Sequence, residues 1–400
     1  MKNAENNAIM FSGDFMFSIL LAIIYLAFIS LGLPDSLLGS AWPVMTEELS
    51  VPLSYAGMLT MIISGGTIIS SLFSGRVINR FGTGLVTAIS VALTALALLG
   101  FSLADTFTML CVLAVPYGFG AGAVDAALNN YVALHYSSRQ MSWLHAFWGV
   151  GVSISPNIMS FCLFRNYGWH TGYRIVFILQ TVLVIILFLS LPLWESGNNR
   201  NDGSTRSKTL TISQALRIKG VPYVLVAFFC FCSVEATAGL WASTYMVEHH
   251  HLDVETAALF GSFFYIGEMS GRFLNGFVAD RFGDKRMVRI GILTIIAGII
   301  LLSLPFESNI LSLVSLLIIG LGAAPIYPCI IHSTPDNFGK ENSQSLIGLQ
   351  MACAYIGCTF MPPVFGLIAQ HISVALYPAF LALFTVLMLF MTIQLNKKCR

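Results

Sequence analysis

The chain has 400 residues, of which 56% are hydrophobic and only 10% are charged, and its formal net charge is +1. A typical soluble domain carries about 25% charged residues, so this composition excludes a set of ordinary soluble domains. The near-zero net charge also gives no bulk attraction for nucleic acid, which is not an expected partner. The expected surroundings are a lipid bilayer.

Apolar runs long enough for a spanning helix of roughly 20 residues follow one another along the whole chain. The expected spans are 15–44, 53–76, 84–104, 107–135, 140–164, 172–193, 221–247, 255–279, 287–305, 309–332, 342–370 and 373–394. The predicted fold class is therefore an all-α membrane protein with twelve transmembrane helices in two six-helix bundles.

The one long polar stretch, residues 195–220, lies at the midpoint and is rich in Asn, Arg, Gly and Ser. Such a composition is typical of a flexible, solvated linker. It predicts an N-terminal six-helix bundle at 1–194, a cytoplasmic linker at 195–220 and a C-terminal six-helix bundle at 221–400.

The two halves are related by an internal repeat. Residues 75–82 (GRVINRFG) return as residues 276–283 (GFVADRFG), about 200 positions later. Two further pairs keep nearly the same offset: Gly118-x-Gly120 with Gly320-x-Gly322, and Asp35-x-x-x-Gly39 with Glu235-x-x-x-Gly239. Parallel repeats of half the chain length in an apolar sequence are typical of secondary transporters.

The basic residues predict the topology. Of the 20 Lys and Arg, only Arg165 and Arg174 are expected in outside loops, and Arg272 lies within a span. The others are expected on the cytoplasmic side, where Lys and Arg accumulate. The chain is therefore expected to be a multi-pass protein of the cell (inner or plasma) membrane with both termini cytoplasmic.

The second repeat copy continues as Gly283-Asp284-Lys285-Arg286 and resembles the loop between helices 2 and 3 of the major facilitator superfamily. The first copy departs from that motif, with Asn79 in place of Asp. The resemblance covers the whole chain. It implies two six-helix bundles around a central cavity that opens alternately to each side.

A narrower resemblance concerns helices 1 and 4. The segment from Asp125 to Tyr131 (DAALNNY) is similar to the acid-x-x-x-Asn segment in helix 4 of the fucose–proton symporter family, and Asp35 falls where that family carries an acid in helix 1. In that family these acids are associated with proton coupling and sugar binding. Asp125 replaces the usual Glu and Asn130 stands where Pro is common, which leaves the identity of the sugar open.

Four acids are expected at membrane depth, where a charged side chain costs about 2.5–3.5 kcal/mol on insertion scales. A carboxyl group removed from water holds its proton more tightly, which suits a proton carrier. The predicted proton-coupling residues are Asp35, Asp125, Glu235 and His145. The alternatives are a structural hydrogen bond for the two aspartates and packing for Glu235 and His145.

The fourth acid, Glu268, lies one helical turn before Arg272, so an ion pair between positions i and i+4 is expected. Together with the repeated loops it predicts a conformational gate, made of Arg80, Glu268, Arg272, Asp280 and Arg281.

Uncharged amides and aromatic rings in apolar runs are candidates for binding a polyol, since amides can hydrogen-bond hydroxyl groups and rings can stack on a sugar. The predicted substrate-binding residues are Asn129, Asn130, Trp148, Trp241, Tyr265, Tyr327 and Gln350. The alternatives are ties between helices for the amides and an interfacial aromatic belt for the rings. Trp42, Trp143 and Trp169 are expected in such a belt.

The expected function is proton-coupled uptake of a small polar solute, with a sugar as the expected class; a proton-driven drug or metabolite efflux antiporter is the alternative, and sodium coupling stays open. A membrane sensor is less favoured because the chain has no large soluble domain. No nucleotide loop, metal-ligand cluster or nucleophile constellation favours an enzyme, a cofactor or a metal, and Cys230-x-Cys232 is interpreted as packing. The expected partners are a small-molecule solute and protons, and the expected state is a monomer.

Overall fold

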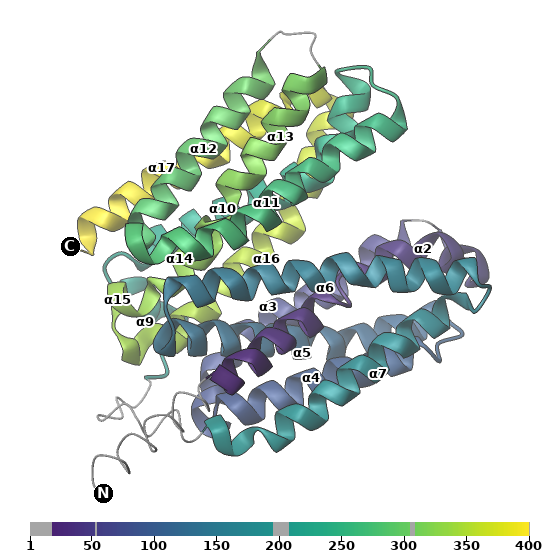
Figure 1. The fold of residues 1–400 in the computed structure, drawn as a ribbon, viewed down its shortest axis with the longest axis horizontal. Coiled ribbons are helices and arrows are strands. Elements are labelled where there is room, and N and C mark those ends of the chain that lie inside the picture. The colour runs from purple at the N-terminus through teal and green to yellow at the C-terminus, as the bar shows by residue number, and fades with distance from the viewer. Residues whose placement is uncertain (1–17, 53, 195–207, 305–308, 400) are drawn as a thin grey trace, which may run out of the picture. The chain divides into compact units, whose positions relative to one another are not determined.

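The computed structural model describes residues 18–52, 54–194, 208–304 and 309–399, whose regular elements are all helices (Figure 1). Eleven of the described helices are long and apolar enough to cross a membrane. A further helix, α11 (Val254–Phe282), is similarly long but carries Glu268 and Arg272, which lower its mean hydropathy. The predicted fold class, an all-α protein with twelve membrane helices, is confirmed.

The helix bounds follow the predicted spans to within several residues. The first half holds a helix at 18–32, α2 (Leu37–Glu48), α3 (Tyr55–Phe81), α4 (Thr83–Phe101), α5 (Phe107–His135), α6 (Ser138–Phe164) and α7 (Gly168–Leu189). The second half holds α9 (Ile212–Arg217), α10 (Val221–Glu248), α11, α12 (Asp284–Ser303), α13 (Asn309–Ala323), α14 (Ile326–His332), α15 (Thr334–Phe338), α16 (Lys340–His371) and α17 (Tyr377–Lys398).

The internal repeat is visible in the backbone. Helix α3 ends at Gly82 (φ 81°, ψ 155°) and α11 ends at Gly283 (φ 77°, ψ 151°), so the two copies share one uncommon conformation. This region of φ and ψ is essentially restricted to glycine. Both helices therefore run a few residues past their predicted ends and stop where the glycine redirects the chain into the next helix.

Internal contacts divide the chain into two compact units. The first unit comprises 1–128 and 147–207, and the second comprises 129–146 and 208–400. In the first unit α4 packs along α7. In the second, α13 packs against both α11 and α12, and α10 packs against α16 and α17 (Figure 1).

Part of the predicted linker, residues 195–207, lies outside the described residues. Within its remainder, α9 begins at a capping box formed by Thr211 and Gln214. The backbone N–H of Lys208 donates to the carbonyl of Glu341 at 2.7 Å, which ties this end of the linker to α16. The division into bundles at 1–194 and 221–400 stays a prediction.

The expected positions of Trp42 and Trp169 are wrong. Both side chains are buried in the core of the first unit, with Trp169 fully inaccessible, rather than placed in an interfacial belt. The indole N–H of Trp169 donates to Glu48 Oε2 at 2.6 Å, and its ring stacks on His170. An indole whose only donor is satisfied is stable in a core, and the distant partner Glu48 cannot be recognised from local sequence.

Glycines at repeat-related positions allow close helix crossings. A Cβ built on Gly118 would collide with the carbonyl oxygen of Ile63, and one on Gly320 with that of Phe264. In each case the obstacle is backbone of a neighbouring helix, which cannot rotate away. Small residues at such crossings are what lets membrane helices approach closely.

Replacing Gly320 with alanine is therefore expected to destabilise the protein by about 1–3 kcal/mol, the usual cost of overpacking. Gly57, which lies in α3 with open space around its Cβ position, is the matched control. Gly57→Ala should be neutral or stabilising, since alanine is the better helix former by up to about 1 kcal/mol. Thermal unfolding of the two purified variants checks the contrast, and equal melting temperatures would contradict it.

Candidate functional site

The helix of the first spanning segment is interrupted at Asp35. The helix at 18–32 gives way to a turn at 33–36, and α2 begins at Leu37. Pro34 lies in this turn; it has no N–H to donate and disfavours helical geometry at the residue before it. Non-helical backbone at membrane depth is tolerated where it is buried in protein or lines a watery cavity. Asp35 therefore lies in a turn between two helices and not within a regular helix.

Both carboxylate oxygens of Asp35 are hydrogen-bonded. The hydroxyl of Tyr117 on α5 donates to Oδ1 at 3.3 Å, and the indole N–H of Trp148 on α6 donates to Oδ2 at 3.0 Å. Asp35 is nevertheless exposed, whereas Tyr117 is buried. The carboxylate is thus held in a fixed position by two donors while it stays accessible.

The second acid of this unit, Asp125 on α5, is buried, with 4% of its surface exposed. It lies on the same helix as Tyr117, whose hydroxyl donates to Asp35. These two acids of the first unit are thus one accessible and one buried carboxyl group, each able to take up a proton. Among the predicted site residues, the structure brings Asp35 and Trp148 into contact.

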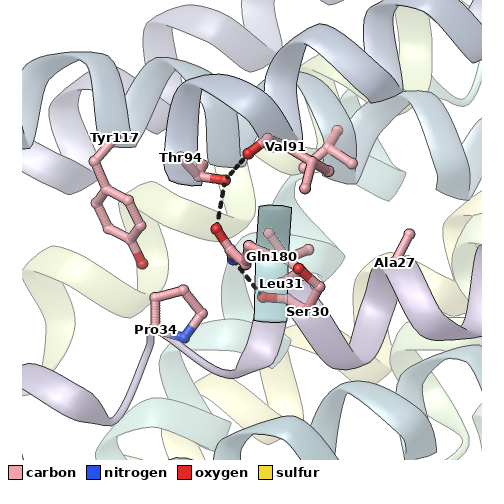
Figure 2. Close-up of a pocket in the computed structure, with 9 residues that line it drawn as sticks. Ala27, Ser30, Leu31, Pro34, Val91, Thr94, Tyr117 and Gln180 are labelled. Carbon is pink, nitrogen blue, oxygen red and sulfur yellow. Dashed lines mark hydrogen bonds between the residues drawn. The ribbon is translucent and has the colours of Figure 1, made fainter. Parts of the chain in front are cut away.

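Gln180 on α7 adjoins this site and was missed by sequence reasoning. Its amide N–H donates to the carbonyl of Ser30 at 2.9 Å, and its Oε1 accepts from Thr94 at 3.3 Å. Figure 2 shows Gln180 between these two partners, with Tyr117 on an adjoining wall of a small pocket. The pocket volume is about 10 Å³, close to the minimum for one water molecule and far too small for a sugar. The signal for Gln180 was an amide inside the apolar run 172–193.

The second unit carries a buried ion cluster. Arg272 Nη2 lies 2.8 Å from Glu235 Oε1 and 2.5 Å from Glu268 Oε1. The side chains of Arg272 and Glu268 are 5% and 6% exposed, and that of Glu235 is 18% exposed. The predicted pair of Glu268 and Arg272 is present. The contact of Arg272 with Glu235 on α10 was not predicted, because the two residues are distant in sequence.

His145 lies in a packed polar group. One ring nitrogen, Nε2, is 3.1 Å from Asn129 Oδ1, and the ring meets that of Tyr327 edge-on with 4.5 Å between centroids. The hydroxyl of Tyr327 contacts Met351 Sδ at 3.1 Å. The structure therefore brings together three predicted residues, His145, Asn129 and Tyr327, from α6, α5 and α14.

The amides of Asn130 and Gln350 are buried and bonded to other side chains. Asn130 donates to Gln344 at 2.6 Å and accepts from the hydroxyl of Ser343 at 2.7 Å. Gln350 accepts from the hydroxyl of Thr334 at 3.1 Å. These contacts favour ties between helices over contact with a solute for both residues.

The remaining two predicted rings, those of Trp241 and Tyr265, lie on α10 and α11. The indole N–H of Trp241 donates to the carbonyl of Pro362 at 3.0 Å, and the ring packs edge-on against Phe365. Tyr265 is 55% exposed, and a Cβ built on Gly239 would collide with its hydroxyl.

Asp280, in the second copy of the repeat, lies against the N-terminal end of α6. Asp280 Oδ1 accepts from the backbone N–H of Arg139 at 3.1 Å, and Oδ2 accepts from the hydroxyl of Ser137 at 3.0 Å. The guanidinium of Arg139 adds a contact of 3.4 Å to Oδ2. Ser137 directly precedes α6 and Arg139 lies in its first turn, where unpaired N–H groups and the helix dipole favour an anion.

The other two predicted gate residues are exposed arginines. Arg281 follows Asp280 on α11, and Arg80 lies at the related position on α3. The guanidinium of Arg80 lies over the ring of Phe81, 5.4 Å from its centroid. Only the second copy carries the acid, because Asn79 occupies the related position in the first.

Replacing Asp280 with alanine should cost about 0.5–2 kcal/mol, the usual range for loss of a helix cap. Asp280→Asn should cost less, since the amide oxygen still accepts hydrogen bonds although the charge is gone. Thermal unfolding of both variants measures the difference. An alanine variant as stable as the wild type would show that the cap carries no stabilisation.

A family model described as Major Facilitator Superfamily matches residues 24–273, and a second match spans residues 224–397. The chain belongs to the Major Facilitator Superfamily. The resemblance of the repeated loop is thereby confirmed, and this member of the superfamily is a multi-pass membrane transporter, not an enzyme.

Known members of the superfamily are similar along most of their length. The glucose/mannose transporter GlcP of Bacillus subtilis is 22% identical over 321 residues, which cover 76% of this chain and 77% of that protein. The cis,cis-muconate transport protein of Acinetobacter baylyi is 22% identical over 381 residues, covering 91% and 90%. These two relatives carry chemically different solutes, so similarity at this level does not name the solute.

The crystal structure of the transporter FucP in its outward conformation matches this facilitator with a TM-score of 0.78. The alignment covers 96% of this chain and 100% of FucP at 16% sequence identity. At that identity the likeness establishes the fold alone.

Proposed function

We propose that this facilitator couples the uptake of a small polyhydroxylated solute, a sugar, to proton movement by alternating access. The observation that carries the proposal is Asp35, an accessible carboxylate at a break in the first spanning segment, held by Tyr117 and Trp148. A carboxylate at membrane depth is costly, which is why such a group marks a functional site by default. Both termini lie in the cytoplasm in this proposal, and the transporter is a monomer of the plasma membrane.

Each residue of the Asp35 group has a distinct role in the proposal. Asp35 and Asp125 carry the transported proton, Asp35 as the accessible carboxyl group and Asp125 as the buried one. Trp148 offers a sugar its ring face while its N–H holds Asp35. Protonation of Asp35 weakens its hydrogen bonds with Tyr117 and Trp148, so proton binding and solute binding become linked.

The residues of the second unit are proposed in supporting roles. Glu235 is balanced by Arg272 and is less suited to carry a proton than Asp35, so we place it with Glu268 in the gate. His145 and Asn129 are bonded to one another, and they face a solute only if that bond opens. The efflux alternative shares the fold and the acids and differs in the chemistry of its cargo.

The test is counterflow in proteoliposomes with a panel of labelled sugars, and with cis,cis-muconate as the non-sugar arm. The proposal expects exchange of at least one sugar, and accumulation of that sugar under an imposed pH gradient but not under a sodium gradient. Exchange of muconate alone would overturn the sugar assignment. Extrusion of amphipathic dyes without sugar exchange would favour the efflux antiporter.

A further inference from the structure

Two thiols and a carboxylate from α10 and α16 converge in the second unit. The Sγ atoms of Cys232 and Cys358 and a carboxylate oxygen of Glu235 all lie within 4.8 Å of one another. The thiol of Cys358 also contacts the carbonyl of Cys232 at 3.7 Å. In sequence, Cys230-x-Cys232 has no His or second Cys partner nearby, since Cys358 is 126 positions from Cys232. The fold supplies the partner that the local pattern lacks.

We propose that Cys232, Glu235 and Cys358 form a binding site for a thiophilic divalent cation, Zn²⁺ or its heavier analogue Cd²⁺. Thiolate sulfur selects soft and borderline cations over Mg²⁺ and Ca²⁺. A tetrahedral zinc ion has bonds of about 2.3 Å to sulfur, which places two sulfur ligands about 3.8 Å apart. The two sulfur atoms lie within 4.8 Å of one another, so they need to approach by about 1 Å at most to reach that spacing. Three protein ligands leave a fourth position for water or a ligand.

The proposed site exchanges two protons for one divalent cation. Binding converts both thiols to thiolates, so two protons leave as the dication enters and the net charge of the site is unchanged. This matters because adding net charge to a membrane interior is costly.

Arg272 helps to orient the carboxylate. Its guanidinium donates to Oε1 of Glu235 at 2.8 Å, which holds this carboxylate beside the two thiols. Such outer contacts fix the direction of a ligand. Glu235, at 18% exposed, is also the most accessible member of its ion cluster.

The chain offers matched controls on both helices. Cys230 precedes Cys232 on α10, and Cys353 precedes Cys358 on α16, and neither belongs to the cluster. Cys230→Ser and Cys353→Ser therefore remove a thiol from the same helices without touching the three ligands.

The experiment titrates the purified full chain with Cd²⁺ and follows ultraviolet absorbance from thiolate-to-cadmium charge transfer. The expected result is one Cd²⁺ per chain. Cys232→Ser and Cys358→Ser should each weaken binding by on the order of tenfold or more and reduce the absorbance, while both controls behave as the wild type. Glu235→Gln should weaken binding but keep the absorbance. Wild-type protein without the band, or controls as defective as the ligand variants, would overturn the proposal.

A measurement on wild-type protein avoids dependence on variants that fail to fold. X-ray absorption of the Zn²⁺-loaded chain should show two sulfur neighbours at about 2.3 Å. A shell of nitrogen and oxygen alone would overturn the site. Neither readout requires transport, so the failure of this proposal and the failure of sugar symport are separate results.

Discussion

Asp35→Asn is expected to abolish accumulation of solute under an imposed proton gradient while leaving counterflow exchange measurable. Asparagine keeps one oxygen that can accept from the indole N–H of Trp148, and its amide N–H can donate to the hydroxyl of Tyr117, so the local structure should survive. An amide does not take up a proton in this pH range, so the driving force is lost. The measurement is uptake of a sugar identified by counterflow into proteoliposomes with and without a pH gradient.

The matched control is Asp105→Asn, which removes an exposed acid between α4 and α5. It should accumulate solute as the wild type does. Asp35→Glu, which restores a titratable group on a longer side chain, should recover part of the accumulation. An Asp35→Asn variant that still concentrates the solute would place proton coupling elsewhere.

Arg272→Gln is expected to be the most destabilising single substitution described here, by about 3–5 kcal/mol. It leaves Glu235 and Glu268 buried without their shared cation. Removing one partner of a buried pair costs much more than removing the whole group, since the remaining charge has no compensation. The melting temperature and folded yield in detergent measure the loss.

Two comparisons make this prediction specific. Arg281→Gln on the same helix alters an exposed arginine and should leave the melting temperature nearly unchanged. The triple variant Glu235→Gln, Glu268→Gln, Arg272→Gln should be more stable than Arg272→Gln alone, because it carries no unpaired charge. A triple variant no better than the single would mean that the cost arises from lost packing.

The sequence was sufficient for the architecture because the governing signals are local or periodic. Spans of apolar residues give the helices, and the repeat at 75–82 and 276–283 relates the halves. The pair of Glu268 and Arg272 was also predictable, since residues four apart share a helix face. The break at Pro34 explains why an acid is tolerated in the first span.

Contacts between distant segments could not be predicted in this way. No local rule connects Arg272 to Glu235, Trp169 to Glu48, or Cys232 to Cys358. Each depends on which helices pack together and how they are rotated about their axes. The partners of the predicted substrate amides Asn130 and Gln350 could not be predicted for the same reason, because these partners come from other helices or turns.

The most direct test of the account follows the proton itself. A sugar that exchanges in counterflow is added to a weakly buffered suspension of de-energised cells or vesicles containing the transporter, and the external pH is recorded. Symport through Asp35 predicts transient alkalinisation outside on addition of the sugar, and no change with Asp35→Asn. Sugar entry without any pH change, or an equal change in the variant, would contradict proton coupling at this carboxylate.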